Sequence, residues 1–261
     1  MSYETILYTV ENGVATIILN RPDKLNAFND QMIAEATDAF KQSGRNAEVR
    51  VAVLTGNGRA FSSGQDLADV VERGDDFSIG EHLRHGYHKL IKQMVRLEKP
   101  IIGAINGVAA GAGCGVALAT DFRIASDKAS FMLAFSKVGL VPDSGTNWFL
   151  PRLIGQARAY EMAFTADKVP AQKAYDWGMI NRVVPAEQLY EEVAAWAGSM
   201  ATGATLAYGL AKRAMYKAWD SNLFDALEYE AYLQEIAGRS EDNKEGVTAF
   251  LEKRAPQFKG K

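Results

Sequence analysis

The sequence is poor in the side chains on which several protein classes depend. Its 261 residues include one cysteine, Cys114, which excludes an intrachain disulfide framework and a multi-cysteine zinc site. The net charge of −3 offers no basic surface for nucleic acid. No apolar run reaches the roughly 20 residues of a bilayer span, and the first residues lack the basic and apolar stretches of a signal peptide. We therefore expect a cytoplasmic protein that binds neither nucleic acid nor membrane.

Histidine is scarce too, with three residues, His82, His85 and His88, in one short stretch. A Ser-His-Asp triad would have to take its base from this stretch, and no Gly-x-Ser-x-Gly motif supplies a nucleophile. A serine hydrolase is therefore not expected. On a single helix this spacing turns the three side chains progressively apart, and helical zinc pairs favour i, i+4 spacing. We expect no metal site.

The N-terminal part of the chain predicts a hairpin followed by a helix. Two β-rich runs, Ile6–Val10 and Val14–Asn20, flank an Asn-Gly pair that suits a tight turn. Asn29 is a candidate cap for a helix whose apolar residues recur at helical spacing and which ends near Gly44.

Two apolar runs, Val49–Thr55 and Pro100–Ile105, predict buried strands that each lead into a glycine-containing loop. The second loop opens a helix of small residues that includes Cys114, where a helix start could lower the thiol pKa. From Ser144 onward the pattern is almost entirely helical. Because strands and helices alternate in the first half, we expect an α/β core with a helical C-terminal part packed on it.

The two glycine loops, residues 56–64 and 106–115, allow more than one interpretation. Neither has the Gly-x-Gly-x-x-Gly spacing of a dinucleotide site, and no phosphate-binding P-loop is present. Each loop could instead give one backbone N–H to an oxyanion hole, because unpaired N–H groups at a helix start favour negative charge. Both loops could also be tight turns that only allow close packing.

Four motifs together resemble the enoyl-CoA hydratase/isomerase (crotonase) superfamily over essentially the whole chain. They are Asn20–Ala27 (NRPDKLNA), Arg59–Leu67 (RAFSSGQDL), Ile105–Gly113 (INGVAAGAG) and Trp177–Val184 (WGMINRVV). The resemblance implies an α/β crotonase (ClpP/crotonase-like) fold of repeated β-β-α units, with a core over residues 1–200 and a helical trimerisation part over 201–261. It also implies an acyl-CoA thioester substrate, no separate cofactor, and a homotrimer or a dimer of trimers.

The resemblance also assigns site residues. The oxyanion hole would be the backbone N–H groups of Gln65 and Ala112, and Phe250 and Lys253 would reach CoA from a neighbouring subunit. The other positions that it implies for binding CoA or substrate are Lys24, Leu25, Ala27, Ala60, Ser63, Gly64, Asp66, Leu67, Val108, Gly111 and Phe135.

The carboxylates indicate which reaction the family site would carry out. The two glutamates of the hydratase pattern would fall at Gly115 and Phe135, where neither side chain transfers protons. Asp143 lies in a segment that resembles the epoxyphenylacetyl-CoA isomerase branch, whose aspartate is the acid/base residue, although Thr146 stands where that branch often has glycine. From its position before a helix, Asp143 could instead be a helix cap.

The sequence therefore favours an enoyl-CoA double-bond isomerase, or an epoxyphenylacetyl-CoA ring isomerase, with Asp143 as its one acid/base group. The alternative is an enoyl-CoA hydratase of fatty-acid or aromatic-acid degradation. An aromatic acyl-CoA dehalogenase would use His88 as a secondary residue, but that pattern wants tryptophan at Phe135. A non-catalytic acyl-CoA-binding or RNA-associated protein is the remaining hypothesis.

Overall fold

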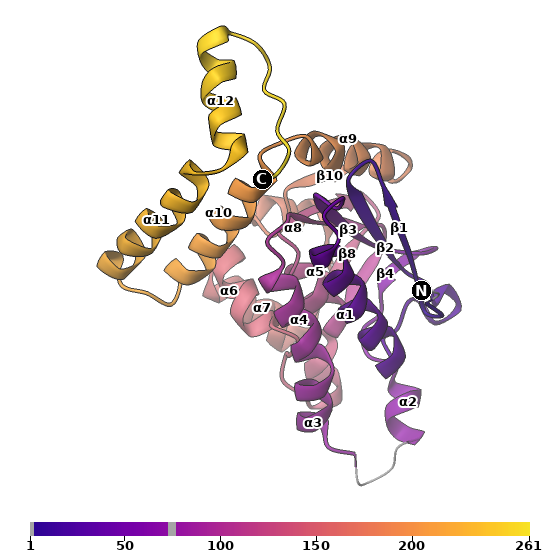
Figure 1. Cartoon of the computed structure of the whole chain (residues 1–261). Coiled ribbons are helices and arrows are strands. Elements are labelled where there is room, and N and C mark those ends of the chain that lie inside the picture. The colour runs from indigo at the N-terminus through magenta and orange to yellow at the C-terminus, as the bar shows by residue number, and fades with distance from the viewer. Residues whose placement is uncertain (1–2, 73–76) are drawn as a thin grey trace.

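A twisted six-stranded sheet lies at the centre of the molecule, which is described here from a computed structural model covering residues 3–72 and 77–261 (Figure 1). Its strand order is β1-β2-β3-β5-β7-β10; β1 and β2 are antiparallel and the other pairs are parallel. The expected hairpin is confirmed, since Asn12 and Gly13 both have positive φ between β1 and β2. The strands are β1 (Ile6–Glu11), β2 (Val14–Leu19), β3 (Val51–Gly56), β5 (Ile101–Ile105), β7 (Phe122–Ser126) and β10 (Arg182–Val184).

A second sheet of four short strands follows from the loops of the first. Its order is β4-β6-β8-β9, with bounds β4 (Ala60–Ser62), β6 (Val108–Ala110), β8 (Ser130–Met132) and β9 (Val169–Pro170). The chain alternates between the sheets, because β3, β5 and β7 enter the large sheet and β4, β6 and β8 then enter the small one. The expected repeated β-β-α units are confirmed. The glycine loops are therefore partly strand, and the C-terminal half, expected to be almost entirely helical, also contributes β9 and β10.

Helices cover both faces of the large sheet. Asn29 caps α1 as expected, its side chain accepting a hydrogen bond from Met32 N at 3.0 Å. One expectation is wrong: the three histidines do not share a helix, since Gly86 ends α3 and begins α4. The helices are α1 (Asp30–Arg45), α2 (Leu67–Glu72), α3 (Ile79–His85), α4 (Tyr87–Arg96), α5 (Ala112–Leu118), α6 (Thr146–Ile154), α7 (Gln156–Thr165), α8 (Ala171–Asp176), α9 (Leu189–Ala201), α10 (Thr205–Ala218), α11 (Leu223–Gly238) and α12 (Glu241–Glu252), with short 3-10 helices at Pro22–Lys24, Ala134–Val138 and Ala186–Gln188.

The core has two parts, one on each face of the large sheet. Along β3, Ala52 and Leu54 join the larger cluster, whereas Val51 and Val53 face the smaller cluster under α9. Because both faces of this strand are buried, the continuous apolar run that predicted it is explained.

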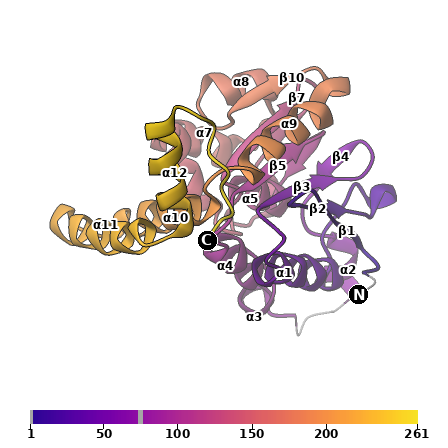
Figure 2. The same ribbon diagram turned by 45° about the horizontal axis from the view of Figure 1, so that its top comes forward.

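Residues 205–261, here called the C-terminal arm, comprise α10, α11, α12 and the tail that follows them. Figures 1 and 2 show α11 and α12 projecting away from the two sheets while the tail returns toward them. Large apolar side chains stay exposed on the arm, among them Phe224 and Phe250 at 78% and 82%. Within the described residues, no helix combines the length and the apolar character needed to span a bilayer.

Candidate active site

The segment Ser63–Asp66, here called the oxyanion loop, is held by a short parallel bridge to Phe28. Phe28 N donates to Gly64 O at 2.7 Å, and Asp66 N donates to Phe28 O at 2.8 Å. Since these two bonds use the groups on one side of the loop, the N–H of Gln65 points the other way. In the part of the chain that the structure describes, that N–H donates to no protein acceptor.

The second N–H of the site belongs to Ala112, the first residue of α5. The first N–H groups of a helix have no partner within it. The oxyanion loop passes close by, because a Cβ on Gly64 would lie 3.4 Å from Ala112 N and 2.8 Å from Ala110 O. Gly113 likewise packs on Ser62, with room for no side chain. The two loops thus bring the N–H groups of Gln65 and Ala112 together at one place.

Asp143 lies in a turn whose next two residues, Ser144 and Gly145, have φ of 51° and 80°. The alternative that Asp143 caps a helix does not hold, because the residue at the cap position of α6 is Gly145 and no side chain caps that helix. The Asp143 carboxylate instead accepts a hydrogen bond from the Ser144 hydroxyl at 2.8 Å. Burial raises its pKa above the ordinary aspartate value, against the opposing effects of Ser144 and of the charge on His82. A carboxyl group with a raised pKa is suited to proton transfer.

Two side chains that the sequence did not single out for the reaction join Asp143 to the oxyanion loop. Tyr87 is fully buried and its hydroxyl donates to Gln65 Oε1 at 2.8 Å. Its pKa is raised by burial first and then by the negative charges of Asp143 and Asp30. His82 Nε2 lies 3.1 Å from the same Gln65 Oε1. Asp143, His82, Tyr87 and Gln65 therefore form one cluster.

The positions of the two hydratase glutamates are filled differently here. A Cβ on Gly115 would lie 2.8 Å from both Ser144 Cβ and Thr146 Oγ1, so the turn after Asp143 occupies the space beside α5. Phe135 is buried in the 3-10 helix Ala134–Val138. At these two positions the site therefore has no carboxylate, and its acid/base candidate among the described residues is Asp143.

The segment Lys24–Ala27 packs against the oxyanion loop, as the family resemblance implies for CoA-binding segments. Ser63 N donates to Leu25 O at 2.9 Å, and Ser63 Oγ donates to Lys24 O at 3.3 Å. Asp66 is paired with Arg21 at 2.9 Å, which helps to lower its pKa. Around these residues lie Ala27, which is buried; Ala60 and Val108, which pair as the first residues of β4 and β6; Leu67, which is exposed at the start of α2; and Gly111, which precedes α5 with φ of 50°.

Other candidate residues lie apart from this cluster within one chain. Phe250 and Lys253 belong to the end of α12 in the C-terminal arm. His88 lies on α4, where burial and the cations Lys92 and Arg84 lower its pKa. The histidine whose charge acts on Asp143 is His82.

One smaller expectation, the lowered pKa of the Cys114 thiol, is wrong. Cys114 is fully buried, and burial raises its pKa to about 12, so the expected effect of a helix start is outweighed. Asp121, in the bend between α5 and β7, accepts hydrogen bonds from Ile101 N and from Lys212 on α10. Among residues 3–72 and 77–261, no group of three or more His, Cys, Asp or Glu side chains is placed to hold a metal ion.

The chain is similar over nearly its whole length to known proteins. The profile of the enoyl-CoA hydratase/isomerase family matches residues 9–261. The chain is 45% identical over 260 residues to 1,2-epoxyphenylacetyl-CoA isomerase of Escherichia coli strain K12, covering 99% of both chains. It is 34% identical over 264 residues to crotonyl-CoA hydratase of Syntrophomonas wolfei, again covering 99% of both. The crystal structure of enoyl-CoA hydratase from Bacillus anthracis superposes with a TM-score of 0.91 and 33% identity, over 99% of this chain and 100% of that one.

Proposed function

The chain belongs to the enoyl-CoA hydratase/isomerase family and has the crotonase fold, and on that premise we propose that it is an isomerase of unsaturated acyl-CoA thioesters. The observation that carries the proposal is the carboxylate of Asp143 in the cluster of Gln65, whose backbone N–H, like that of Ala112, donates to no protein acceptor among the described residues. Hydration by the two-glutamate route has no counterpart, because Gly115 has no room for a side chain and Phe135 carries no acid. The relative of 45% identity that is named as an isomerase supports the same choice.

In the proposed reaction the thioester oxygen accepts hydrogen bonds from Gln65 N–H and Ala112 N–H. The Asp143 carboxylate removes a proton from C2 of a 3-enoyl thioester, and the electron pair moves into a dienolate whose negative charge rests on that oxygen. Asp143 then returns the proton to C4, which leaves the double bond conjugated between C2 and C3. The raised pKa of Asp143 makes its carboxylate a stronger base than an exposed aspartate. These steps use a carboxylate and two peptide groups, and we propose no metal or redox cofactor.

The proposal extends to substrate binding and assembly. Lys24–Ala27 and residues 60–67 would bind the CoA portion, because they lie together beside the N–H pair. The C-terminal arm, with residues 201–204 before it, would serve trimer formation, since its exposed apolar side chains have no cover within one chain. Phe250 and Lys253 would then meet the CoA bound by a neighbouring subunit. We propose a homotrimer or a dimer of such trimers on this ground.

The proposal is tested by offering purified protein a 3-enoyl-CoA, a 2-enoyl-CoA and 1,2-epoxyphenylacetyl-CoA separately. Conjugation of the 3-enoyl ester, or rearrangement of the epoxide, is the expected activity. Asp143→Asn should abolish it while CoA-ester binding changes little, and Asp220→Asn, at an exposed aspartate in the turn after α10, should have no effect. Hydration of the 2-enoyl ester without any isomerisation would contradict the proposal. Unchanged turnover in Asp143→Asn would remove Asp143 from the chemistry.

A further inference from the structure

The side chain of Gln65 is held by two donors that come from two different helices. Gln65 Oε1 accepts from Tyr87 Oη, at the start of α4, and from His82 Nε2, near the end of α3. Because an amide oxygen only accepts hydrogen bonds, Nε2 carries the hydrogen of its bond. The other ring nitrogen, Nδ1, lies 3.1 Å from Asp30 Oδ1 at the start of α1. Helices α3 and α4 therefore each give one donor to Gln65, and α1 is linked to it through the contact of Asp30 with His82.

His82 and Tyr87 form the buried part of this network. The His82 side chain is 8% exposed, and its ring lies between Phe77 and Tyr87, with centroid distances of 5.3 and 5.6 Å. The Tyr87 ring also meets Phe28, the residue that bridges the backbone of the oxyanion loop, at 5.7 Å. Gly86 makes the arrangement possible, because a Cβ there would lie 2.8 Å from His82 O. The break at Gly86 thus brings His82 and Tyr87 to the same acceptor.

We propose that His82 and Tyr87 are positioning residues that fix the Gln65 side chain and thereby aim its backbone N–H at the thioester oxygen. This inference rests on the proposed oxyanion hole and concerns how the Gln65 N–H of that hole is held in its orientation. An oxyanion donor is effective only when it is already oriented, and a misplacement of about 1 Å can cost roughly a hundredfold in rate. The bridge to Phe28 holds the loop backbone on one side, and the pair of donors to Oε1 holds Gln65 on the other.

The other two histidines lie outside this network and supply a matched control. His85 is 71% exposed and pairs with Glu81 on its own helix. The groups that act on Asp143 are Ser144 and His82, and Asp143 in turn acts on Tyr87. His82 thus contacts the oxyanion loop by a hydrogen bond and acts on Asp143 through its charge.

Four variants separate positioning from packing. His82→Phe keeps a flat ring but removes both nitrogens, and Tyr87→Phe removes one oxygen atom. His82→Gln keeps an N–H near the position of Nε2, and His85→Gln is the control. We expect His82→Phe and Tyr87→Phe to lower kcat about tenfold or more with little change in KM. His82→Gln should recover most of the loss, and His85→Gln should match the wild type. Because the charge of His82 lowers the pKa of Asp143, His82→Phe should also move the acid limb of the pH profile to higher pH.

A readout that needs no turnover separates this inference from the proposed reaction. The probe is a 3-oxoacyl-CoA, whose enolate resembles the intermediate and is followed by its near-ultraviolet absorbance. The wild type and His85→Gln should increase the ionised fraction of the bound probe, and His82→Phe and Tyr87→Phe should reduce that increase. An unchanged ionised fraction and unchanged kcat in both Phe variants would overturn the positioning roles alone. A wild type that fails to ionise the probe would overturn the oxyanion hole itself, and with it the proposed function.

Discussion

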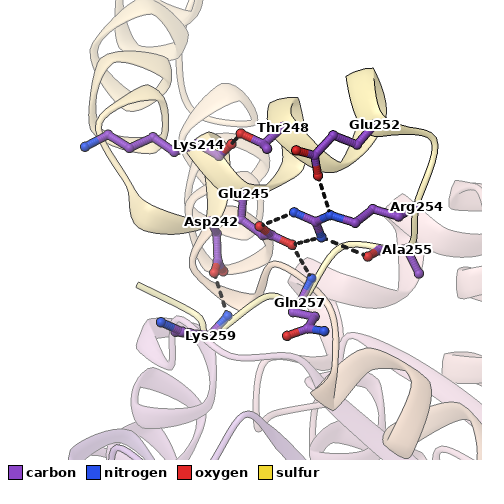
Figure 3. Close-up of polar contacts among 9 residues, drawn as sticks. All are labelled: Asp242, Lys244, Glu245, Thr248, Glu252, Arg254, Ala255, Gln257 and Lys259. Atoms are coloured by element: carbon purple, nitrogen blue, oxygen red, sulfur yellow. Dashed lines mark hydrogen bonds and ion pairs between the residues drawn. The ribbon is translucent and has the colours of Figure 1, made fainter.

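Two carboxylates, Asp143 in the site and Glu245 in the C-terminal arm, lie in opposite surroundings. Asp143 is largely buried with one hydroxyl donor, and burial raises its pKa. Glu245 is exposed, accepts two hydrogen bonds from Arg254 and one from Gln257 N, and these donors lower its pKa to about 2 (Figure 3). The first carboxyl group takes up a proton more readily than an ordinary aspartate, whereas the second holds its negative charge more firmly than an ordinary glutamate. A partly buried carboxylate with few hydrogen-bond donors, such as Asp143, is therefore suited to proton transfer. A carboxylate with several donors, such as Glu245, is suited to holding the tail in place.

The tail of the arm shows what such attachment does. Beyond Arg254, Lys259 N and Gly260 N donate to the buried side chain of Asp242 at 2.6 and 2.8 Å. Figure 3 shows Lys259 and Gln257 lying along α12 beside Asp242 and Glu245. The tail is thereby held against the arm by carboxylates on the first turns of α12.

The largest effect on stability is expected where the C-terminal arm packs on the α/β core, at the ion pair of Asp121 with Lys212. Both side chains are mostly buried, with Nζ to Oδ2 at 2.9 Å, and burial shifts both pKa values toward the neutral forms. Lys212→Met leaves Asp121 without its cation and should lower the free energy of unfolding by about 3–5 kcal/mol, measured by urea denaturation. Lys217→Met, at an exposed site on the same helix, is the control. Equal stability of Lys212→Met and Lys217→Met would show that the packing of α10 on the core does not depend on the pair of Asp121 with Lys212.

The next effect concerns the other half of the oxyanion hole. Ala112 is the first residue of α5, a position that accepts proline, and Ala112→Pro removes its N–H. We expect kcat for isomerisation to fall about 10²–10³-fold, as for the loss of one oxyanion donor. Ala112→Gly keeps the N–H and should stay near wild-type activity. If both variants were equally active, with circular dichroism showing a folded Ala112→Pro, this N–H would have no part in the reaction.

Local signals in the sequence were enough for the main elements of the fold. The Asn12-Gly13 turn, the Asn29 cap and the buried runs of β3 and β5 each depend on neighbouring residues, and each is confirmed. The small sheet was implied only by the family resemblance, through its β-β-α units. Residue patterns do not predict it, because its strands have two or three residues, too few to show a period of two, and their pairing depends on distant partners.

The site was accessible from the sequence only in part. The backbone donors and Asp143 came from a family resemblance and stay predictions for activity. His82 and Tyr87 meet Gln65 across 17 and 22 residues, and no spacing rule connects them. The one available signal was Gly86, a helix-breaking residue inside a cluster of histidines, and it pointed to two helices instead of one.

A smaller effect is expected on the melting temperature, because an ionised Asp143 in its buried position destabilises the folded protein. Since the pKa of Asp143 is raised on folding, its stabilising effect is full below the ordinary aspartate pKa, roughly 3.9, and is lost as pH rises through the raised value. Asp143→Asn should therefore melt a few degrees higher than the wild type at pH 7. The difference should shrink as pH falls toward the ordinary value. Thermal melts across this range check it, and a pH-independent difference would mean that the change acts through packing.

The smallest effect is expected at the exposed pair of Glu245 and Arg254. Because the pKa of Glu245 is lowered to about 2, the pair stabilises the arm above the ordinary glutamate pKa and loses that effect as pH falls toward 2. Exposure and salt weaken such pairs, so Glu245→Gln should lower Tm slightly at low salt and not at all at high salt. Glu228→Gln, at an exposed glutamate on α11, is the control. Glu245→Gln should leave kcat unchanged, in contrast to Asp143→Asn. A fall in kcat would show that this arm reaches an active site, which in the proposed trimer is that of a neighbouring subunit.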